Sequence, residues 1–142
     1  MLLIFSILAT LLMTAFSYVC TMLTGNNFRE PELLNQLINT SRIPLKAGKK
    51  SVLGWLLHLL IGFVFGVIMS LVWDFFELSS YLIFGLISGI IAGVLGILGW
   101  QVMFYLNPQP PDIDLNKFYA QLIVAHVIFS LSFIVLVVLS EG

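Results

Sequence analysis

Four long apolar runs dominate the pattern of hydrophobic and polar positions along the chain. They cover residues 2–23, 52–73, 81–106 and 118–140, and polar or charged residues separate them. An α-helix needs roughly 20 apolar residues to cross the hydrocarbon core of a bilayer, so each run is long enough to do so. The pattern predicts an all-α fold, a four-transmembrane-helix bundle that forms one integral membrane domain over residues 1–142.

A shorter periodic pattern lies in the one sizeable segment between the runs, residues 25–51. Pro31 stands where helices commonly begin, and apolar residues then recur on one helical face. These residues are Leu33, Leu34, Leu37 and Ile38. We expect a short amphipathic surface helix over residues 31–40, with its apolar stripe in the headgroup region of the membrane. A solvated loop is the alternative.

The remaining connections between the runs are short. Residues 107–111 contain three prolines, which remove backbone donors and fix φ, so the third long helix must end there. Asp112 or Asp114 is then placed to cap the fourth. Residues 74–80 leave room only for a tight turn, which predicts that the second and third long helices form an antiparallel hairpin.

Composition places the chain in a membrane and not in water. Of its residues 60% are hydrophobic and only 9% are charged, and the mean hydropathy is +1.08. Soluble domains carry about 25% charged residues, so a soluble globular fold is excluded. No motif typical of a catalytic nucleophile, a metal site or a phosphate loop is present, and we predict no catalytic residue.

The charged residues are distributed unevenly between the two ends of the predicted spans. All six cations lie in the segments after the first and third spans, which must share one side: Arg29, Arg42, Lys46, Lys49, Lys50 and Lys117. The positive-inside rule makes that side cytoplasmic. We therefore expect both termini to be non-cytoplasmic and the surface helix to be cytoplasmic.

The cations beside the surface helix predict contact with lipid. Arg42, Lys46, Lys49 and Lys50 form a basic segment that would attract anionic lipid headgroups. The expected partners are thus membrane lipid, and in addition a second copy of the chain or another membrane protein. No nucleic-acid partner is expected.

Small residues recur every three or four positions along three of the spans. Such stripes let helix backbones approach closely where lipid provides no hydrophobic drive for association. In the first span the stripe consists of hydroxyl residues from Ser6 to Thr21. In the second and third it consists mainly of glycines, and we assign helix packing to Gly54, Gly62, Gly66, Gly85, Gly89, Gly93 and Gly96.

Only two ionisable residues lie well inside the predicted spans. His58 and His126 fall at a similar depth, roughly 8 to 14 Å from the cytoplasmic boundary at 1.5 Å of rise per residue. Gln101, Gln121 and Tyr119 fall at a similar level. Intramembrane ionisable residues are costly to bury and commonly mark functional sites. These five residues are therefore the candidates for ligand or proton binding.

The histidines admit several interpretations. Neutral imidazoles can join helices by hydrogen bonds and have no further role. Alternatively, the pair binds a polar ligand or carries protons in a shallow cavity open to the cytoplasm. A third interpretation is axial ligation of haem b by both imidazoles. A zinc site is not expected, because further ligands are lacking nearby.

The last third of the chain resembles a family of small bacterial membrane proteins. The similar residues are Gly99 and Trp100, the segment 107–111, and the stretch 125–129. They resemble the uncharacterised proteins loosely called YagU-like. The resemblance implies a bacterial inner-membrane location and no particular activity.

The function predicted from these observations is a non-enzymatic one. The primary hypothesis is an accessory or structural helix bundle that acts through contacts with lipid, a partner or itself. The alternative is a transporter-like or haem-binding protein that handles a small ligand or protons at the paired histidines. A cavity that both imidazoles line would favour the alternative, whereas imidazoles packed and hydrogen-bonded between helices would favour the primary hypothesis.

Overall fold

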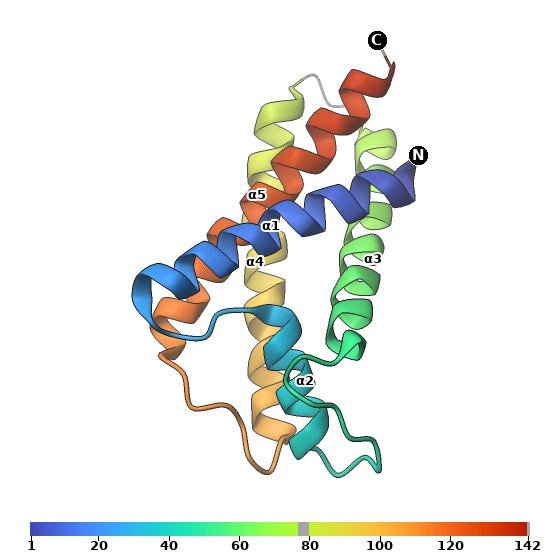
Figure 1. Ribbon diagram of the computed structural model, residues 1–142. Helices are drawn as coiled ribbons and strands as arrows, with labels where there is room; N and C mark the ends of the chain where they lie inside the picture. The colour runs from blue at the N-terminus through green and yellow to red at the C-terminus, as the bar shows by residue number, and fades with distance from the viewer. Residues whose placement is uncertain (77–79, 142) are drawn as a thin grey trace.

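The predicted all-α fold is confirmed by the computed structural model, which describes residues 1–76 and 80–141. Its described residues form five helices and no strand (Figure 1). The helices are α1 (Leu2–Thr24), α2 (Glu30–Thr40), α3 (Val52–Phe76), α4 (Tyr81–Leu106) and α5 (Leu115–Glu141). Asp114 caps α5, because its Oδ1 accepts the N–H of Lys117 at 3.2 Å.

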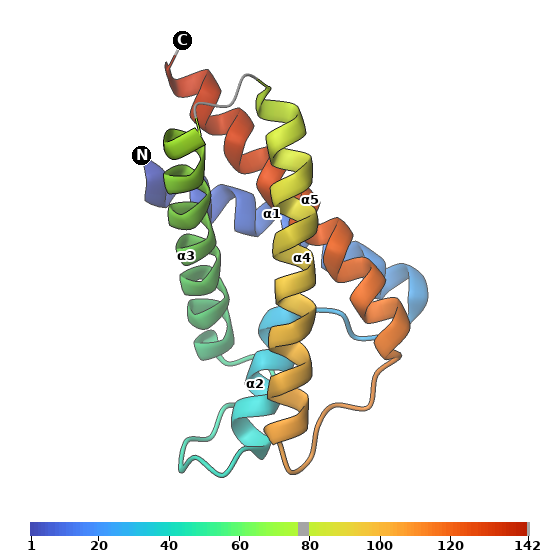
Figure 2. The same cartoon turned by 180° about the vertical axis from the view of Figure 1, so that it is seen from behind.

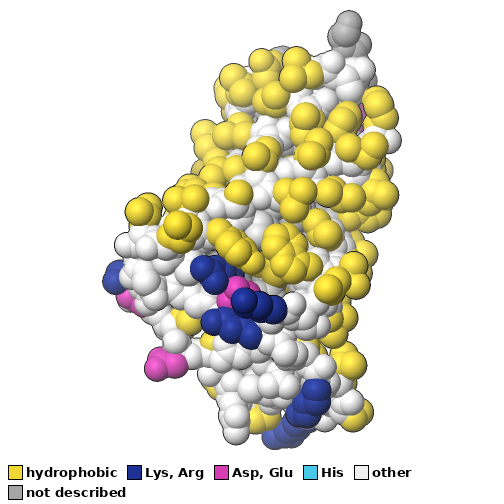
Figure 3. Space-filling model, viewed as in Figure 1, with side chains coloured by type: hydrophobic (Ala, Val, Ile, Leu, Met, Phe, Trp, Pro, Cys, Tyr) yellow, Lys and Arg dark blue, Asp and Glu magenta, His cyan; other side chains and the backbone are white. Residues whose placement is uncertain are grey.

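Four of these helices, α1, α3, α4 and α5, are long and apolar enough to cross a membrane. Their leucine and isoleucine side chains cover much of the surface, as Figure 3 shows for one face. In the same view the Lys and Arg side chains gather toward the end of the molecule that holds α2, and hydrophobic side chains cover the opposite part. This distribution is what a bilayer requires, with a broad apolar surface and charges at its edge.

The long helices pack through three main contacts, α4 with α5, α1 with α5 and α1 with α3. Helix α4 packs mainly along α5, and α1 packs against both α5 and α3, while α2 packs against α3. Figures 1 and 2 show α3 and α4 standing apart, with α1 and α5 running obliquely to them. The two helices run antiparallel, as the predicted hairpin requires, but they barely touch, so they do not pack closely against each other. Part of the predicted turn, residues 77–79, lies outside the described residues.

Small residues lie where the paired helices approach most closely. A Cβ atom at Gly62 would collide with Thr10 Oγ1, and one at Gly66 would collide with Ser6 Oγ, both across the α1–α3 interface. In α4, a Cβ at Gly89 would lie 2.6 Å from the Cα of Val127 in α5. Any side chain larger than hydrogen would thus separate these helices. We call the α1–α3 and α4–α5 contacts the glycine interfaces.

The remaining glycines assigned to packing also face neighbouring elements. Gly54 lies against α2, where a Cβ would collide with the Pro31 carbonyl, and its N–H donates to Asn35 Oδ1 at 2.8 Å. The other three face α5: Gly85 against Leu131, Gly93 against Ile123, and Gly96 against His126. Helix α3 is thus held by α1 and α2, and α4 by α5.

The short helix predicted over residues 31–40 is present, but its environment differs from the expectation. Helix α1 ends at Gly25, whose φ of 72° is left-handed, and the chain turns back so that α2 lies against protein. Leu33, Leu34 and Leu37 are buried with Trp100 and other apolar side chains of α4 and α5. The stripe therefore contacts the bundle and not the headgroup region. The sequence could not distinguish the two environments, because an apolar face packs equally well on either.

Candidate ligand-binding site

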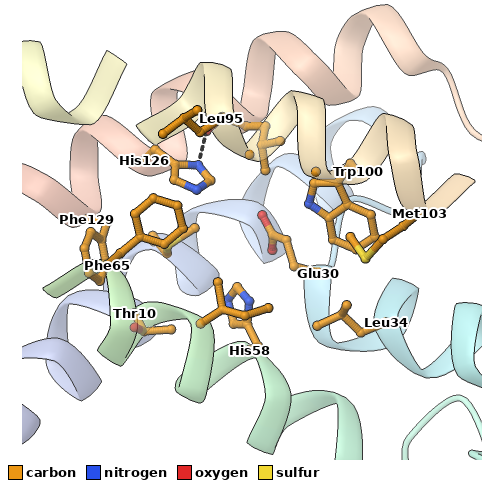
Figure 4. A pocket seen from close by; sticks show the side chains of 16 residues that line it. Thr10, Glu30, Leu34, His58, Phe65, Leu95, Trp100, Met103, His126 and Phe129 are labelled. Atoms are coloured by element: carbon orange, nitrogen blue, oxygen red, sulfur yellow. Dashed lines mark hydrogen bonds between the residues drawn. The ribbon is translucent and has the colours of Figure 1, made fainter. Parts of the chain in front are cut away.

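A cavity of about 170 Å³ lies between α3 and α4, at the level where α2 meets the bundle. All five helices contribute to its lining, and Figure 4 shows the main side chains. Three titratable groups face it: Glu30 from α2, His58 from α3 and His126 from α5. The walls are otherwise mostly apolar and include Phe65 and Trp100. An apolar cavity with a few convergent polar groups is the usual form of a small-molecule site.

His58 is fixed in position by a hydrogen bond to α1. Its Nε2 lies 2.9 Å from Thr14 Oγ1, and that hydroxyl donates its only proton to the Thr10 carbonyl at 2.6 Å. Nε2 must therefore carry a proton and donate to Thr14, because the threonine oxygen has none left to give. In the neutral imidazole the other nitrogen, Nδ1, is then an acceptor. It has no hydrogen-bond partner within the described part of the chain.

In His126 the roles of the two ring nitrogens are exchanged relative to His58. Its Nδ1 lies 2.8 Å from the carbonyl of Leu122, which can only accept, so Nδ1 carries the proton (Figure 4, dashed line). The imidazole packs edge-on against Phe65, with ring centres 5.8 Å apart, and lies against Gly96. Nε2 is left as an acceptor with no bonded partner among the described residues. Each histidine thus presents one unprotonated nitrogen.

Glu30 is the third titratable group, and it is 1% exposed. Its Oε1 accepts the Ser17 hydroxyl at 2.7 Å and lies 3.5 Å from Gln121 Nε2. Its other oxygen, Oε2, is buried and has no hydrogen-bond partner among the residues that the structure describes. Burial raises the pKa of this carboxyl from an ordinary 4.5 to about 7, although the bonds from Ser17 and Gln121 oppose the shift. The carboxyl therefore changes charge near neutral pH.

The remaining predicted polar candidates do not line the cavity. Gln121 is buried beside it, where its Nε2 donates to Ser17 at 2.6 Å and lies 3.5 Å from Glu30 Oε1, so it supports the Glu30 carboxylate. Gln101 is exposed on α4, and Tyr119 is half-buried against Phe118. The structure thus brings together the two histidines and places the other three candidates elsewhere.

The predicted headgroup cations are exposed at the end of the molecule that holds α2. Lys49 Nζ lies 3.6 Å from Glu32 Oε2, and Lys46 Nζ donates to the Asn39 carbonyl at 3.1 Å. Arg42 and Lys50 are exposed as well. Side chains in these positions are free to extend toward a lipid surface.

The cavity that the two histidines line is small for haem b. Axial ligation needs an unprotonated nitrogen from each imidazole on opposite sides of an open slot. The cavity, at about 170 Å³, is smaller than the roughly 300 Å³ at which pockets for drug-sized ligands begin. Nor does any group of three His, Cys, Asp or Glu side chains in the described residues come close enough together to hold a metal ion.

Glu30 is the site residue that sequence reasoning missed. It lies between Arg29 and Pro31, one residue before the predicted surface helix over residues 31–40. A signal was nevertheless present, since Glu30 stands three, four and seven residues before Leu33, Leu34 and Leu37. A carboxyl in register with an apolar stripe shares its buried face.

Comparisons with other proteins add no relative. No protein-family model matches the chain, and neither a curated protein nor a solved structure matches it. The resemblance to YagU-like proteins therefore stays a prediction, and the function has to be argued from the cavity itself.

Proposed function

We propose that this integral membrane protein binds a small membrane-dissolved molecule in the cavity between α3 and α4. The observation that carries the proposal is the partnerless oxygen of Glu30, in a cavity that His58 and His126 also line. A buried polar atom without a partner costs about 1–3 kcal/mol, and Glu30 Oε2 is such an atom on a residue that lines the cavity. A ligand that hydrogen-bonds to it would recover that cost.

The position of the cavity favours a route from the bilayer. Helices α3 and α4 border it and barely touch each other, and Ile61 and Leu95, which line it, are 43% and 54% exposed. In a membrane these exposed side chains face hydrocarbon. A lipid-soluble molecule can therefore reach the polar groups without crossing water, which suits a receptor, carrier or chaperone of such a molecule better than an enzyme.

The accessory role predicted first is supported by a different observation. His58 joins α3 to α1 through Thr14, as a purely structural histidine would. Under this second candidate function, the cavity is a packing defect and the chain acts through its exposed surfaces on lipid, a partner or another copy. His126 argues against it, because the hydrogen bond that its imidazole makes within the described residues is to its own helix and not to another.

Location and orientation complete the proposal. The gathering of cations at one end supports a cytoplasmic position for α2, with both termini on the other side, by the positive-inside rule. Arg42, Lys46, Lys49 and Lys50 would then contact anionic headgroups of the cytoplasmic leaflet. A bacterial inner membrane is the location implied by the resemblance.

Replacement of His126 tests the proposal. Protein purified from its native type of membrane would be extracted with organic solvent, and the released small molecules compared by mass spectrometry with those from H126L. We expect one species to be abundant in the wild type and depleted in H126L. Gln101→Leu is the matched control, because Gln101 is exposed on α4 outside the cavity, and it should retain the species. Identical extracts from all three proteins would contradict ligand binding.

A further inference from the structure

The titratable groups of the cavity share one chemical property, which is that each offers an acceptor, whereas the lining also contains one indole donor, the Nε1–H of Trp100. Nδ1 of His58 and Nε2 of His126 are lone-pair nitrogens, for the reasons given above, and ionised Glu30 offers Oε2. The one hydroxyl in the lining, that of Thr10, already donates to the Ser6 carbonyl at 2.7 Å. A ligand that matches such a set must be rich in donors. An alkylammonium group has three donors and no acceptor.

Aromatic side chains add to this preference for a cation. Phe65, Trp100 and Phe129 line the same cavity. Ring faces attract ammonium groups within about 6 Å, and more strongly where water is excluded. A carboxylate or phosphate, by contrast, would face Glu30 and two lone-pair nitrogens and would be repelled.

An apolar groove continues from the cavity along the same two helices. It has a volume of about 240 Å³ and shares Phe65 and Leu95 with the cavity. On α3 it extends from Phe65 to Val72, which is roughly 10 Å at 1.5 Å of rise per residue. Its one hydroxyl, on Ser88, donates to the Phe84 carbonyl at 2.7 Å. The groove alone would only accept lipid chains, but its continuity with the polar cavity suits one molecule with a head and a tail.

We infer that the ligand is a single-chain lipophilic amine, with its ammonium held by Glu30, His58 and His126 and its hydrocarbon chain in the groove between α3 and α4. This inference rests on the proposed function and names its ligand class. The ammonium head is assigned to the cavity because all three acceptors lie there. The hydrocarbon tail is assigned to the groove because the one hydroxyl in its lining is already hydrogen-bonded.

Binding of an amine would be coupled to the release of one proton. Below neutral pH the Glu30 carboxyl is protonated, since its pKa is about 7. When the ammonium binds, the carboxyl O–H bond breaks, the carboxylate keeps the electron pair, and the proton passes to solvent. Other titratable or charged groups around Glu30 are Tyr18 and Cys20 on α1, His58 on α3, His126 on α5, and Arg29 and Glu32 beside it. With Glu30 dominant, the affinity should rise roughly tenfold between pH 6 and pH 8.

Three chain-matched ligands test the inference on the intact protein in lipid nanodiscs. Dodecylamine, dodecan-1-ol and dodecanoic acid would be titrated calorimetrically at pH 6 and pH 8, with protein-free nanodiscs subtracted to remove simple partitioning. The same titrations would use E30Q, which keeps the size of the side chain and removes its charge. Glu32→Gln is the control, because Glu32 pairs with Arg29 and Lys49 outside the cavity.

The inference predicts that dodecylamine binds most tightly, and about tenfold more tightly at pH 8 than at pH 6. E30Q should lose both the preference and the pH dependence, whereas E32Q should keep them. If the alcohol or the acid binds as well as the amine, the amine class is wrong but the proposed ligand site stands. If none of the three binds wild-type protein beyond the level of H126L, the proposed function fails as well.

Discussion

The two glycine interfaces and the cleft between α3 and α4 are built from the same helices, yet they differ in how closely those helices approach. Across α1–α3 the glycines face hydroxyls, and across α4–α5 they face the backbone or side chains of α5, so that little space remains for a Cβ atom. Between α3 and α4, the facing residues include Phe65, Ile68 and Leu95, and a cavity and a groove separate the helices. Bulky side chains hold these two helices apart.

This difference shows how a bundle with many small residues can still contain a site. Each helix has one face on which a stripe of small residues allows close contact, and α3 presents that face to α1 and α2 while α4 presents it to α5. The faces left over between α3 and α4 cannot interlock in the same way. The cavity is therefore a consequence of where the stripes point, and it forms where the polar residues of α2, α3 and α5 converge.

Replacement of Gly89 by leucine should have the largest effect, because it fills a glycine interface. A Cβ there would lie 2.6 Å from the Cα of Val127, so the α5 backbone must move. We expect a loss of more than about 3 kcal/mol in the free energy of unfolding, at the upper end of overpacking costs. Thermal unfolding in detergent measures it. Gly99→Ala is the control, since nothing lies within 4 Å of its Cβ position. Equal destabilisation by both substitutions would refute the contrast between the two regions.

Glu30→Gln should produce the next largest effect, and only at alkaline pH. A carboxyl whose pKa is raised on folding, here from 4.5 to about 7, binds its proton more tightly in the folded state. Its stabilising contribution is present below pH 4.5, declines as the pH rises to 7, and is absent above that value. The shift corresponds to a cost of up to about 3 kcal/mol at pH 8. E30Q should therefore be more stable than wild type at pH 8 and similar at pH 5, in unfolding curves recorded at both values. A wild-type protein whose stability is constant between pH 5 and pH 8 would show that Glu30 is not buried as described.

Thr14→Val should have a smaller effect on the α1–α3 interface. The substitution removes the acceptor for His58 Nε2 and keeps the size of the side chain. Hydrogen bonds between membrane helices contribute about 1 kcal/mol, so we expect a loss of that size in unfolding free energy. Thr24→Val is the control, because Thr24 is exposed and its hydroxyl bonds locally, donating to the Cys20 carbonyl and accepting the Asn26 N–H. A T14V protein as stable as T24V would mean that His58 is not fixed by α1.

The sequence alone predicted the long helices well and their partners poorly. Continuous apolar runs and the prolines at 107–111 determine where α1, α3, α4 and α5 begin and end within a few residues. The direction in which α2 faces could not be predicted, because Leu33 and Leu37 would suit lipid and protein equally. Nor could the separation of α3 from α4, which depends on tertiary packing. That His58 and His126 could meet was predictable from their similar depth in the membrane. That Glu30 lines the same cavity was not, because it depends on the burial of α2.

Infrared difference spectroscopy of Glu30 tests most directly the claim that a buried carboxyl lines the cavity between α3 and α4. Spectra of the wild type in nanodiscs, titrated between pH 4 and pH 9, should show a protonated carboxyl C=O band that disappears with a midpoint at pH about 7. The band should be absent from E30Q and retained in E32Q. A band that disappears near pH 4.5, or one that persists in E30Q, would contradict the account.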